Sequence, residues 1–255
     1  MGPLVFAFQY FTNFPLPGKP DLNENTAAAS LTWLPLTGLA IGLCLAAVEI
    51  VCQNTGFPQL PHVKSILIMA LELWVGGAYF IQGYCHSCDG VLSGLGRIRS
   101  LERMSESGIR PIGGLGLVFA ILGKLLLLAE LSLYEDFLFL LLFYPCWARW
   151  SVSFASYRYQ TANDEGMAYF FKIGQKPVYI VLSSVFTLLF LIIMPQAFYM
   201  GAMVSFIAVL FCCSQVQARL GGQTEQTFGM VAVTAELAFL LCSAISEAML
   251  RSMGG

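Results

Sequence analysis

Long apolar runs recur along this chain of 255 residues, and they constrain its fold more than any other feature. A helix needs roughly 20 mostly apolar residues to cross a bilayer, and its backbone polar groups must be satisfied internally. Runs of that kind cover residues 31–52, 63–82, 112–133, 137–157, 177–194, 197–214 and 227–250. The sequence therefore predicts an all-α fold: a polytopic integral membrane bundle of about seven transmembrane helices, in a single domain spanning residues 1–255.

The composition supports the same class of protein. Hydrophobic residues make up 57% of the chain and charged residues 11%, whereas soluble domains carry about 25% charged residues. Membrane lipid is therefore an expected contact, and since there is no block of basic residues, nucleic acid is not. The eight cysteines lie mostly inside the apolar runs, where they are expected to act as small core residues rather than as a disulfide framework.

The positions of Lys and Arg predict the orientation in the membrane, because these residues are enriched in cytoplasmic loops. Residues 87–111 hold four arginines, residues 158–176 hold three cations, and residues 215–226 hold one arginine. The loops near residues 55, 135 and 195 hold none. We therefore expect the three basic loops on the cytoplasmic face, where they could build one active site, with the N-terminus inside and the C-terminus outside.

The most polar long interval between the apolar runs is residues 79–114. Within it, Gln82, His86 and Asp89 recur at helical spacing, which would put their side chains on one face. The imidazole and carboxylate could bind a divalent cation together with Glu106, since Mg²⁺ favours one or two carboxylates plus substrate phosphates. The alternative is a polar helix end in contact with lipid headgroups. A zinc site at Cys85-His86-Ser87-Cys88 is not favoured, because structural zinc needs four nitrogen or sulfur ligands.

Further charged side chains are candidates for binding an anionic substrate. The arginines of residues 87–111 could bind phosphates, or could serve only topology and contacts with anionic lipid; they are Arg97, Arg99, Arg103 and Arg110. Arg149 lies within an apolar run and is expected to face the bundle interior and pair with a phosphate or a carboxylate. Glu236 is the strongest candidate among the carboxylates of the spans, because its span begins at the polar 215–226 loop.

Several segments, in order along nearly the whole chain, resemble one family. They are AFQYFTNFPLP (7–17), TWLPLTGLAIG (32–42), QGYCHSCDG (82–90), LERMSESGI (101–109), PCWARW (145–150), NDEGMAYFF (163–171) and LGGQTEQTFG (220–229). The third is similar to D-G-x-x-D-x-x-D-G, the fourth to L-E-I-M-K-D-S-R-I-G, and the last to L-G-G-hydrophobic-T-G-D-x-x-G. The family that these patterns resemble is cobalamin synthase, also called adenosylcobinamide-GDP ribazoletransferase.

The resemblance implies a Mg²⁺-dependent transferase, with Mn²⁺ or another divalent cation as an alternative, in a bacterial or archaeal cytoplasmic membrane. Its partners would be adenosylcobinamide-GDP and α-ribazole or α-ribazole phosphate, its products adenosylcobalamin or its phosphate and GMP, and a homo-oligomer is left open. The implied catalytic residues are His86, Asp89, Glu106 and Arg149, of which the first three would bind the metal. The implied substrate-binding residues are Gln82, Arg97, Arg99, Arg103, Arg110, Glu225, Gln226 and Glu236.

The chain departs from the family pattern where the chemistry would need negative charge. Gln82 and His86 stand where the pattern has Asp, and Glu225-Gln226 stand where it has Gly-Asp. Because phosphoryl-type transfer depends on metal-assisted charge neutralisation, these changes support a second hypothesis, a weak or inactive relative that binds corrinoid. A third hypothesis, a CDP-alcohol-type phosphotransferase, ranks lower because residues 82–106 lack that family's paired Asp.

Overall fold

A computed structural model describes residues 2–254 except 19, 21–22 and 56–59. The described residues are mostly helical and contain no β-strand, only an isolated bridge between Thr161 and Gln223. The helices are α1 (Gly2–Phe11), α2 (Glu24–Ser30), α3 (Leu34–Asn54), α4 (Pro61–Val75), α5 (Tyr79–Val91), α6 (Arg97–Ser105), α7 (Pro111–Leu131), α8 (Phe137–Arg158), α9 (Met167–Ile173), α10 (Pro177–Ile192), α11 (Ala197–Leu220) and α12 (Glu225–Gly254). A short 3₁₀ turn, Leu31–Trp33, joins α2 to α3.

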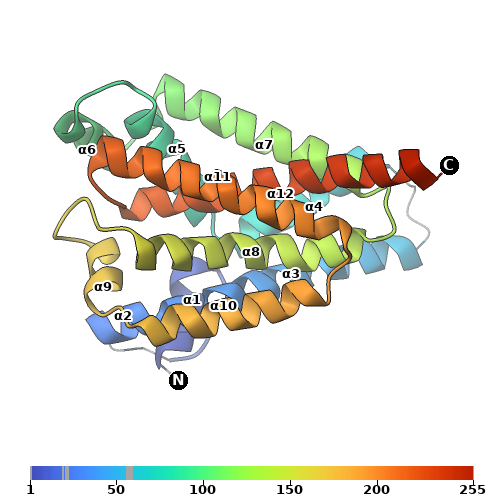
Figure 1. Ribbon diagram of the computed structural model, residues 1–255, viewed down its shortest axis with the longest axis horizontal. Helices are drawn as coiled ribbons and strands as arrows, with labels where there is room; N and C mark the ends of the chain where they lie inside the picture. The colour runs from blue at the N-terminus through green and yellow to red at the C-terminus, as the bar shows by residue number, and fades with distance from the viewer. Residues whose placement is uncertain (1, 19, 21–22, 56–59, 255) are drawn as a thin grey trace.

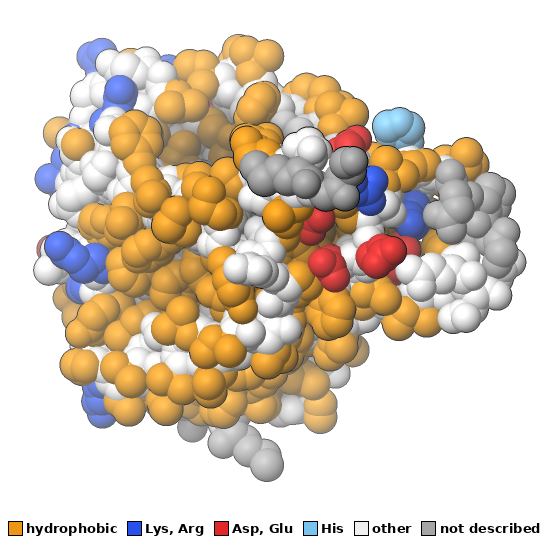
Figure 2. Space-filling model, turned by 45° about the vertical axis from the view of Figure 1, so that its right-hand side comes forward, with side chains coloured by type: hydrophobic (Ala, Val, Ile, Leu, Met, Phe, Trp, Pro, Cys, Tyr) orange, Lys and Arg blue, Asp and Glu red, His pale blue; other side chains and the backbone are white. Residues whose placement is uncertain are grey.

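The predicted all-α membrane bundle is confirmed. Five helical segments are long and apolar enough to cross a membrane, and the number rises to seven if each of two bent helix pairs counts as one span. Large apolar side chains point outward along these helices, for example Trp74 at 73% and Phe119 at 70% exposure. Hydrophobic side chains cover most of the face drawn in Figure 2, and Lys and Arg lie along its left edge and also beside the Asp and Glu side chains on its right. The protein is a multi-pass membrane protein.

Residues 63–82, predicted as the second span, do not form one straight helix. The segment divides into α4 and α5, which meet at an angle of 90° across Gly76, Gly77 and Ala78. Gly77 and Ala78 have φ values of 68° and 53°, a left-handed conformation that ends α4 and that glycine adopts at little cost. A similar bend of 100° separates α9 from α10, so the expected 158–176 loop contains a helix.

Glycines bring the long helices close together. A Cβ at Gly38 would lie 2.4 Å from the carbonyl oxygen of Pro145, and one at Gly42 would lie 2.7 Å from that of Leu141. Helix α3 therefore contacts α8 backbone to backbone, a close approach typical of membrane helices with glycines four residues apart.

The polar connections gather at one end of the bundle. Figure 1 shows α6, α9 and the connection from α11 to α12 at the left end, and the connections from α7 to α8 and from α10 to α11 at the right end. The three basic loops thus share one end, as expected from their Lys and Arg content. The candidate site lies at this end.

Candidate functional site

Helices α5 and α12 cross at two glycines, and this crossing sets the geometry of the site. A Cβ at Gly229 would lie 2.3 Å from the carbonyl oxygen of Phe80, and a Cβ at Gly83 would lie 2.8 Å from that of Gln226. Only glycine allows the backbones to come this close. The contact brings the 82–90 segment against the 220–229 segment, although about 140 residues separate them in the sequence.

A hollow of ≈ 290 Å³ lies beside this crossing, and we call it the His86 lobe. Helix α5 contributes Tyr79, Gln82 and His86, and the end of α6 contributes Glu106. Its other lining residues are Gly83, Met104, Ser105, Ser107, Glu225 and Gln226. The Nδ1 atom of His86 is buried and has no hydrogen-bond partner among the described residues. The sequence-predicted residues Gln82, His86, Glu106, Glu225 and Gln226 therefore meet in one place.

A second hollow of ≈ 270 Å³ adjoins the first, and we call it the Asn163 lobe. It shares Met104, Ser105, Glu225 and Gln226 with the His86 lobe, so the two are halves of one cleft roofed by α6. The rest of its lining comes from α6, from the 163–168 segment and from the turn before α12: Leu101, Asn163, Glu165, Gly166, Met167, Ala168, Gln223 and Thr224. Glu225 is the ionisable side chain common to both halves.

The N-terminal helix reaches this cleft through Tyr10. Its phenol donates a hydrogen bond to Oε1 of Glu225, which fixes that carboxylate at the junction of the two lobes. Burial, and then the hydrogen bond to Glu225, raise the pKa of Tyr10 well above its usual value, so the phenol remains the donor.

Asp89 lies outside the lining of both lobes, and its carboxylate contacts the start of α7. Its Oδ1 accepts from the backbone N–H of Gly113 at 2.7 Å, and its Oδ2 accepts from that of Arg110 at 3.1 Å. These N–H groups belong to the start of α7, where a carboxylate satisfies unpaired donors and interacts favourably with the helix dipole. Asp89 thus caps α7.

The four arginines of residues 97–110 surround the cleft without lining either lobe, as far as the described residues define it. Arg97 donates to the carbonyl oxygen of Ala162 at 2.8 Å, and it lies against a shallow depression that Arg99 also lines. The side chains of Arg110 and Glu106 are about half exposed and form an ion pair, and this hydrogen bond raises the pKa of Arg110. These contacts indicate that Arg97 and Arg110 anchor α6 and the residues that flank it.

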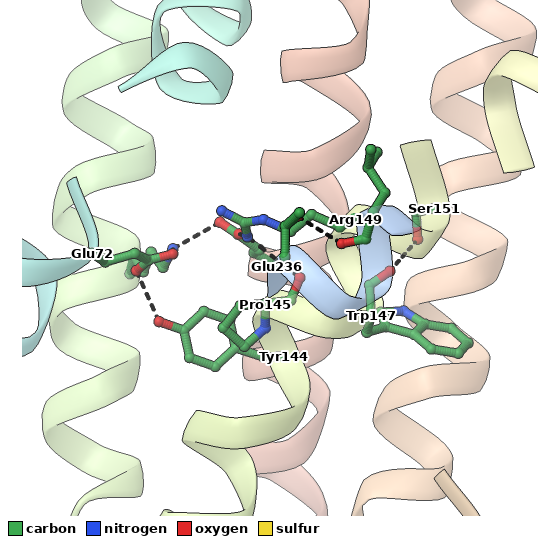
Figure 3. Close-up of polar contacts among 10 residues, drawn as sticks. Glu72, Tyr144, Pro145, Trp147, Arg149, Ser151 and Glu236 are labelled. Carbon is green, nitrogen blue, oxygen red and sulfur yellow. Dashed lines mark hydrogen bonds and ion pairs between the residues drawn. The ribbon is translucent and has the colours of Figure 1, made fainter. Parts of the chain in front are cut away.

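Arg149 and Glu236 lie deeper, in an ion-pair network inside the bundle (Figure 3). Nη1 of Arg149 donates to Oε1 of Glu236 at 2.7 Å, and Nζ of Lys124 donates to Oε2 of Glu236 at 2.7 Å and to Oε1 of Glu72 at 2.6 Å. The hydroxyl of Tyr144 donates to Oε2 of Glu72 at 2.8 Å. The expectation that Arg149 pairs with a carboxylate is confirmed. Neither Arg149 nor Glu236 lines the two-lobed cleft among the residues described.

The cleft residues are compatible with a divalent cation only in partnership with a substrate. The described part of the chain contains no group of three or more His, Cys, Asp and Glu side chains placed to hold a metal, so His86, Asp89 and Glu106 are not brought together as expected. The His86 lobe nevertheless presents two carboxylates, Glu106 and Glu225. Mg²⁺ commonly uses one or two carboxylates and completes its shell with substrate phosphates and water.

Comparison with known proteins identifies the family. The profile described as cobalamin-5-phosphate synthase matches residues 3–244. The chain belongs to this family. It is 32% identical over 240 residues to the adenosylcobinamide-GDP ribazoletransferase of Shigella boydii serotype 4, an alignment that covers 91% of this chain and 95% of the relative. The protein of the same name from Escherichia coli O139:H28 gives the same identity and coverage. No solved structure matches.

Some residues of the site were not expected from the sequence. Asn163 and Gln223 lie in segments that resemble family patterns, 163–171 and 220–229, but as neutral side chains they were not singled out. Lys124 was also missed, although a single cation in the middle of an apolar run indicates a buried partner. Membership of the cobalamin-5-phosphate synthase family makes this chain one of a family of transferases, and the cleft is the place where its motif segments converge.

Proposed function

We propose that this protein transfers the phosphocobinamide part of adenosylcobinamide-GDP to α-ribazole or its phosphate, in a bacterial or archaeal cytoplasmic membrane. The observation that supports this most directly is the cleft itself. Four segments that resemble family motifs contribute to the lining of its two lobes: residues 82–90, 101–109, 163–171 and 220–229. The cleft end carries the basic loops, so we place it on the cytoplasmic side.

The reaction balances as a substitution at phosphorus. A ribose hydroxyl oxygen of α-ribazole forms a bond to the phosphorus attached to the cobinamide, and the bond from that phosphorus to the bridging oxygen breaks. GMP leaves with the electron pair of that bond. The hydroxyl proton passes to the imidazole of His86, the histidine that lines the His86 lobe, which acts as the general base.

A divalent cation would be held by Glu106 and Glu225 together with the substrate diphosphate. Bound there, it would neutralise charge on the phosphates. Tyr10 keeps Glu225 oriented toward the junction of the lobes, since it donates to one of that residue's two oxygens. Both Mg²⁺ and Mn²⁺ accept carboxylate ligands, so either metal is suited to this pair.

A second candidate function is binding of the corrinoid without transfer. The observation that favours it is the presence of Gln82, His86 and Gln226 in the cleft, where the family pattern has Asp. Fewer carboxylates weaken the site for a metal, and a weaker metal site slows transfer.

Purified protein in liposomes, supplied with adenosylcobinamide-GDP, α-ribazole and Mg²⁺ or Mn²⁺, separates the two functions. Stoichiometric release of GMP and formation of adenosylcobalamin would support the transferase. Binding of adenosylcobinamide-GDP without GMP release with either metal, in a folded preparation, would reject transfer and support the second function.

A further inference from the structure

We propose that the two lobes divide the substrates: the Asn163 lobe binds α-ribazole, and the His86 lobe binds the diphosphate of the corrinoid substrate. This inference rests on the proposed function and deepens it. Its basis is that two hollows of comparable volume, ≈ 270 and ≈ 290 Å³, share one junction at Glu225 and Gln226. A reaction between two bound substrates requires such a junction.

The walls of the Asn163 lobe suit a flat bicyclic ring. Leu101 and Met104 of α6 contribute apolar walls, and Met167 and Ala168 of α9 contribute others. Thioether side chains are polarizable and make favourable contacts with aromatic rings. The benzimidazole of α-ribazole is a ring of this kind.

Gln223 supplies the lobe with a hydrogen-bond donor that has no partner. Its side chain is 1% exposed, and its Oε1 accepts from the hydroxyl of Thr227 at 2.8 Å. Its Nε2 is buried and unpaired among the described residues. A buried donor without a partner is costly, so a ligand that brings an acceptor relieves that cost. The unsubstituted ring nitrogen and the ribose oxygens of α-ribazole are acceptors.

The backbone around this donor is fixed before any ligand arrives. The N–H of Gln223 donates to the carbonyl oxygen of Gln160 at 2.7 Å, and the carbonyl oxygen of Gln223 accepts from the N–H of Ala162 at 2.9 Å. Arg97 of α6 donates to the carbonyl oxygen of Ala162 at 2.8 Å. The three segments that form the lobe are therefore tied together, and such preorganisation lowers the entropic cost of binding.

Each lobe is lined by Glu225 and one further carboxylate, Glu165 in the Asn163 lobe and Glu106 in the His86 lobe, and the His86 lobe differs in also presenting the imidazole of His86. Glu106, His86 and the shared Glu225 line it, which suits a phosphate group accompanied by a cation. A ribose hydroxyl that extends from the Asn163 lobe would meet the phosphorus at Glu225 and Gln226. There the new oxygen–phosphorus bond forms and GMP departs on the side of the His86 lobe, as in the reaction given above.

Direct binding of α-ribazole tests this division without requiring turnover. Calorimetric titration of the wild-type protein with α-ribazole would be compared with Gln223→Leu, which removes the donor, and Ala168→Leu, which fills the lobe. We expect each change to weaken α-ribazole binding by about tenfold or more. Gln223→Leu would leave an acceptor of the ligand without its hydrogen bond, and Ala168→Leu would occupy the space of the ring. Affinity for adenosylcobinamide-GDP should remain within about twofold.

The matched control is Gln53→Leu, the same substitution at an exposed position on α3, and it should leave both affinities unchanged. The division is overturned if folded wild-type protein does not bind α-ribazole, if both lobe variants bind it as the wild type does, or if they lose affinity for both substrates equally. Absence of GMP release combined with Gln223-dependent binding of α-ribazole would reject transfer and keep the division of ligands.

Discussion

Arg149 on α8 and Glu236 on α12 form an ion pair of 2.7 Å in the interior of the bundle, where the two residues are 3% and 5% exposed. Lys124 on α7 joins Glu236 to Glu72 on α4, so two cations balance two carboxylates across four helices. Glu72 lies at the end of α4, one turn before the bend to α5. The network therefore holds the bend that directs α5 toward the cleft.

Removing one charge from this network should destabilise the protein strongly. Lys124→Met leaves two buried carboxylates with one guanidinium, and an uncompensated buried charge costs about 3–5 kcal/mol. Thermal unfolding in detergent should therefore show a large fall in Tm. The double variant Lys124→Met/Glu72→Gln restores the balance of charge and should recover most of the loss. Equal Tm values for the single and double variants would contradict a charge-balance role.

The cap on α7 should be separable from metal binding. Asp89→Asn keeps one acceptor oxygen but loses the second and the negative charge, which should cost about 1–2 kcal/mol of unfolding free energy. Because Asp89 lies outside the cleft lining, Mn²⁺ affinity followed by electron paramagnetic resonance should not change. Asp136→Asn is the matched control, since Asp136 precedes α8 without a side-chain capping bond. A loss of Mn²⁺ affinity in Asp89→Asn would instead show that Asp89 is a metal ligand.

The sequence predicted the long spans well, because the hydropathy of each helix reflects its contact with lipid. Helices α3, α7, α8, α10, α11 and α12 coincide with apolar runs, since lipid contact requires apolar side chains along the whole helix. Hydropathy did not predict the bend between α4 and α5, because it carries no information about the direction of the backbone. The adjacent glycines Gly76 and Gly77 were the sequence feature that indicated a bend, and Gly77 adopts a left-handed φ.

The site was predicted in part for a comparable reason. Charged and motif residues such as Glu106 and Glu225 stand out in a sequence, and the structure places them in one lobe. Asp89 stood out equally, yet its partners are backbone N–H groups of α7 that no sequence pattern identifies. The Asn163 lobe arises from contacts between segments about 60 residues apart, so only the folded chain assembles it.

The crossing of α5 and α12 should tolerate no added methyl group. Gly229→Ala would place a Cβ against the carbonyl oxygen of Phe80 and the backbone of Tyr84, and relief of such overpacking typically costs about 1–3 kcal/mol. We expect a lower Tm and weaker binding of α-ribazole, because the two helices that form the cleft must separate. Gly123→Ala is the control, since its Cβ would meet only a Leu237 methyl at 3.6 Å. Equal behaviour of the two variants would show that the close crossing is not required.

Restoring carboxylates to the cleft should strengthen its hold on a divalent cation. Gln82 and Gln226 line the His86 lobe together with Glu106 and Glu225, so Gln82→Asp/Gln226→Asp would add two negative charges beside two existing ones. Charges a few ångströms apart interact by several kcal/mol at an effective dielectric near 20, and about 1.4 kcal/mol already corresponds to tenfold affinity. We therefore expect Mn²⁺ to bind at least about tenfold more tightly and GMP release to accelerate. The double variant Gln82→Asn/Gln226→Asn matches the shape without the charge, and if it bound Mn²⁺ as tightly as the Asp pair, the lobe would not be the metal site.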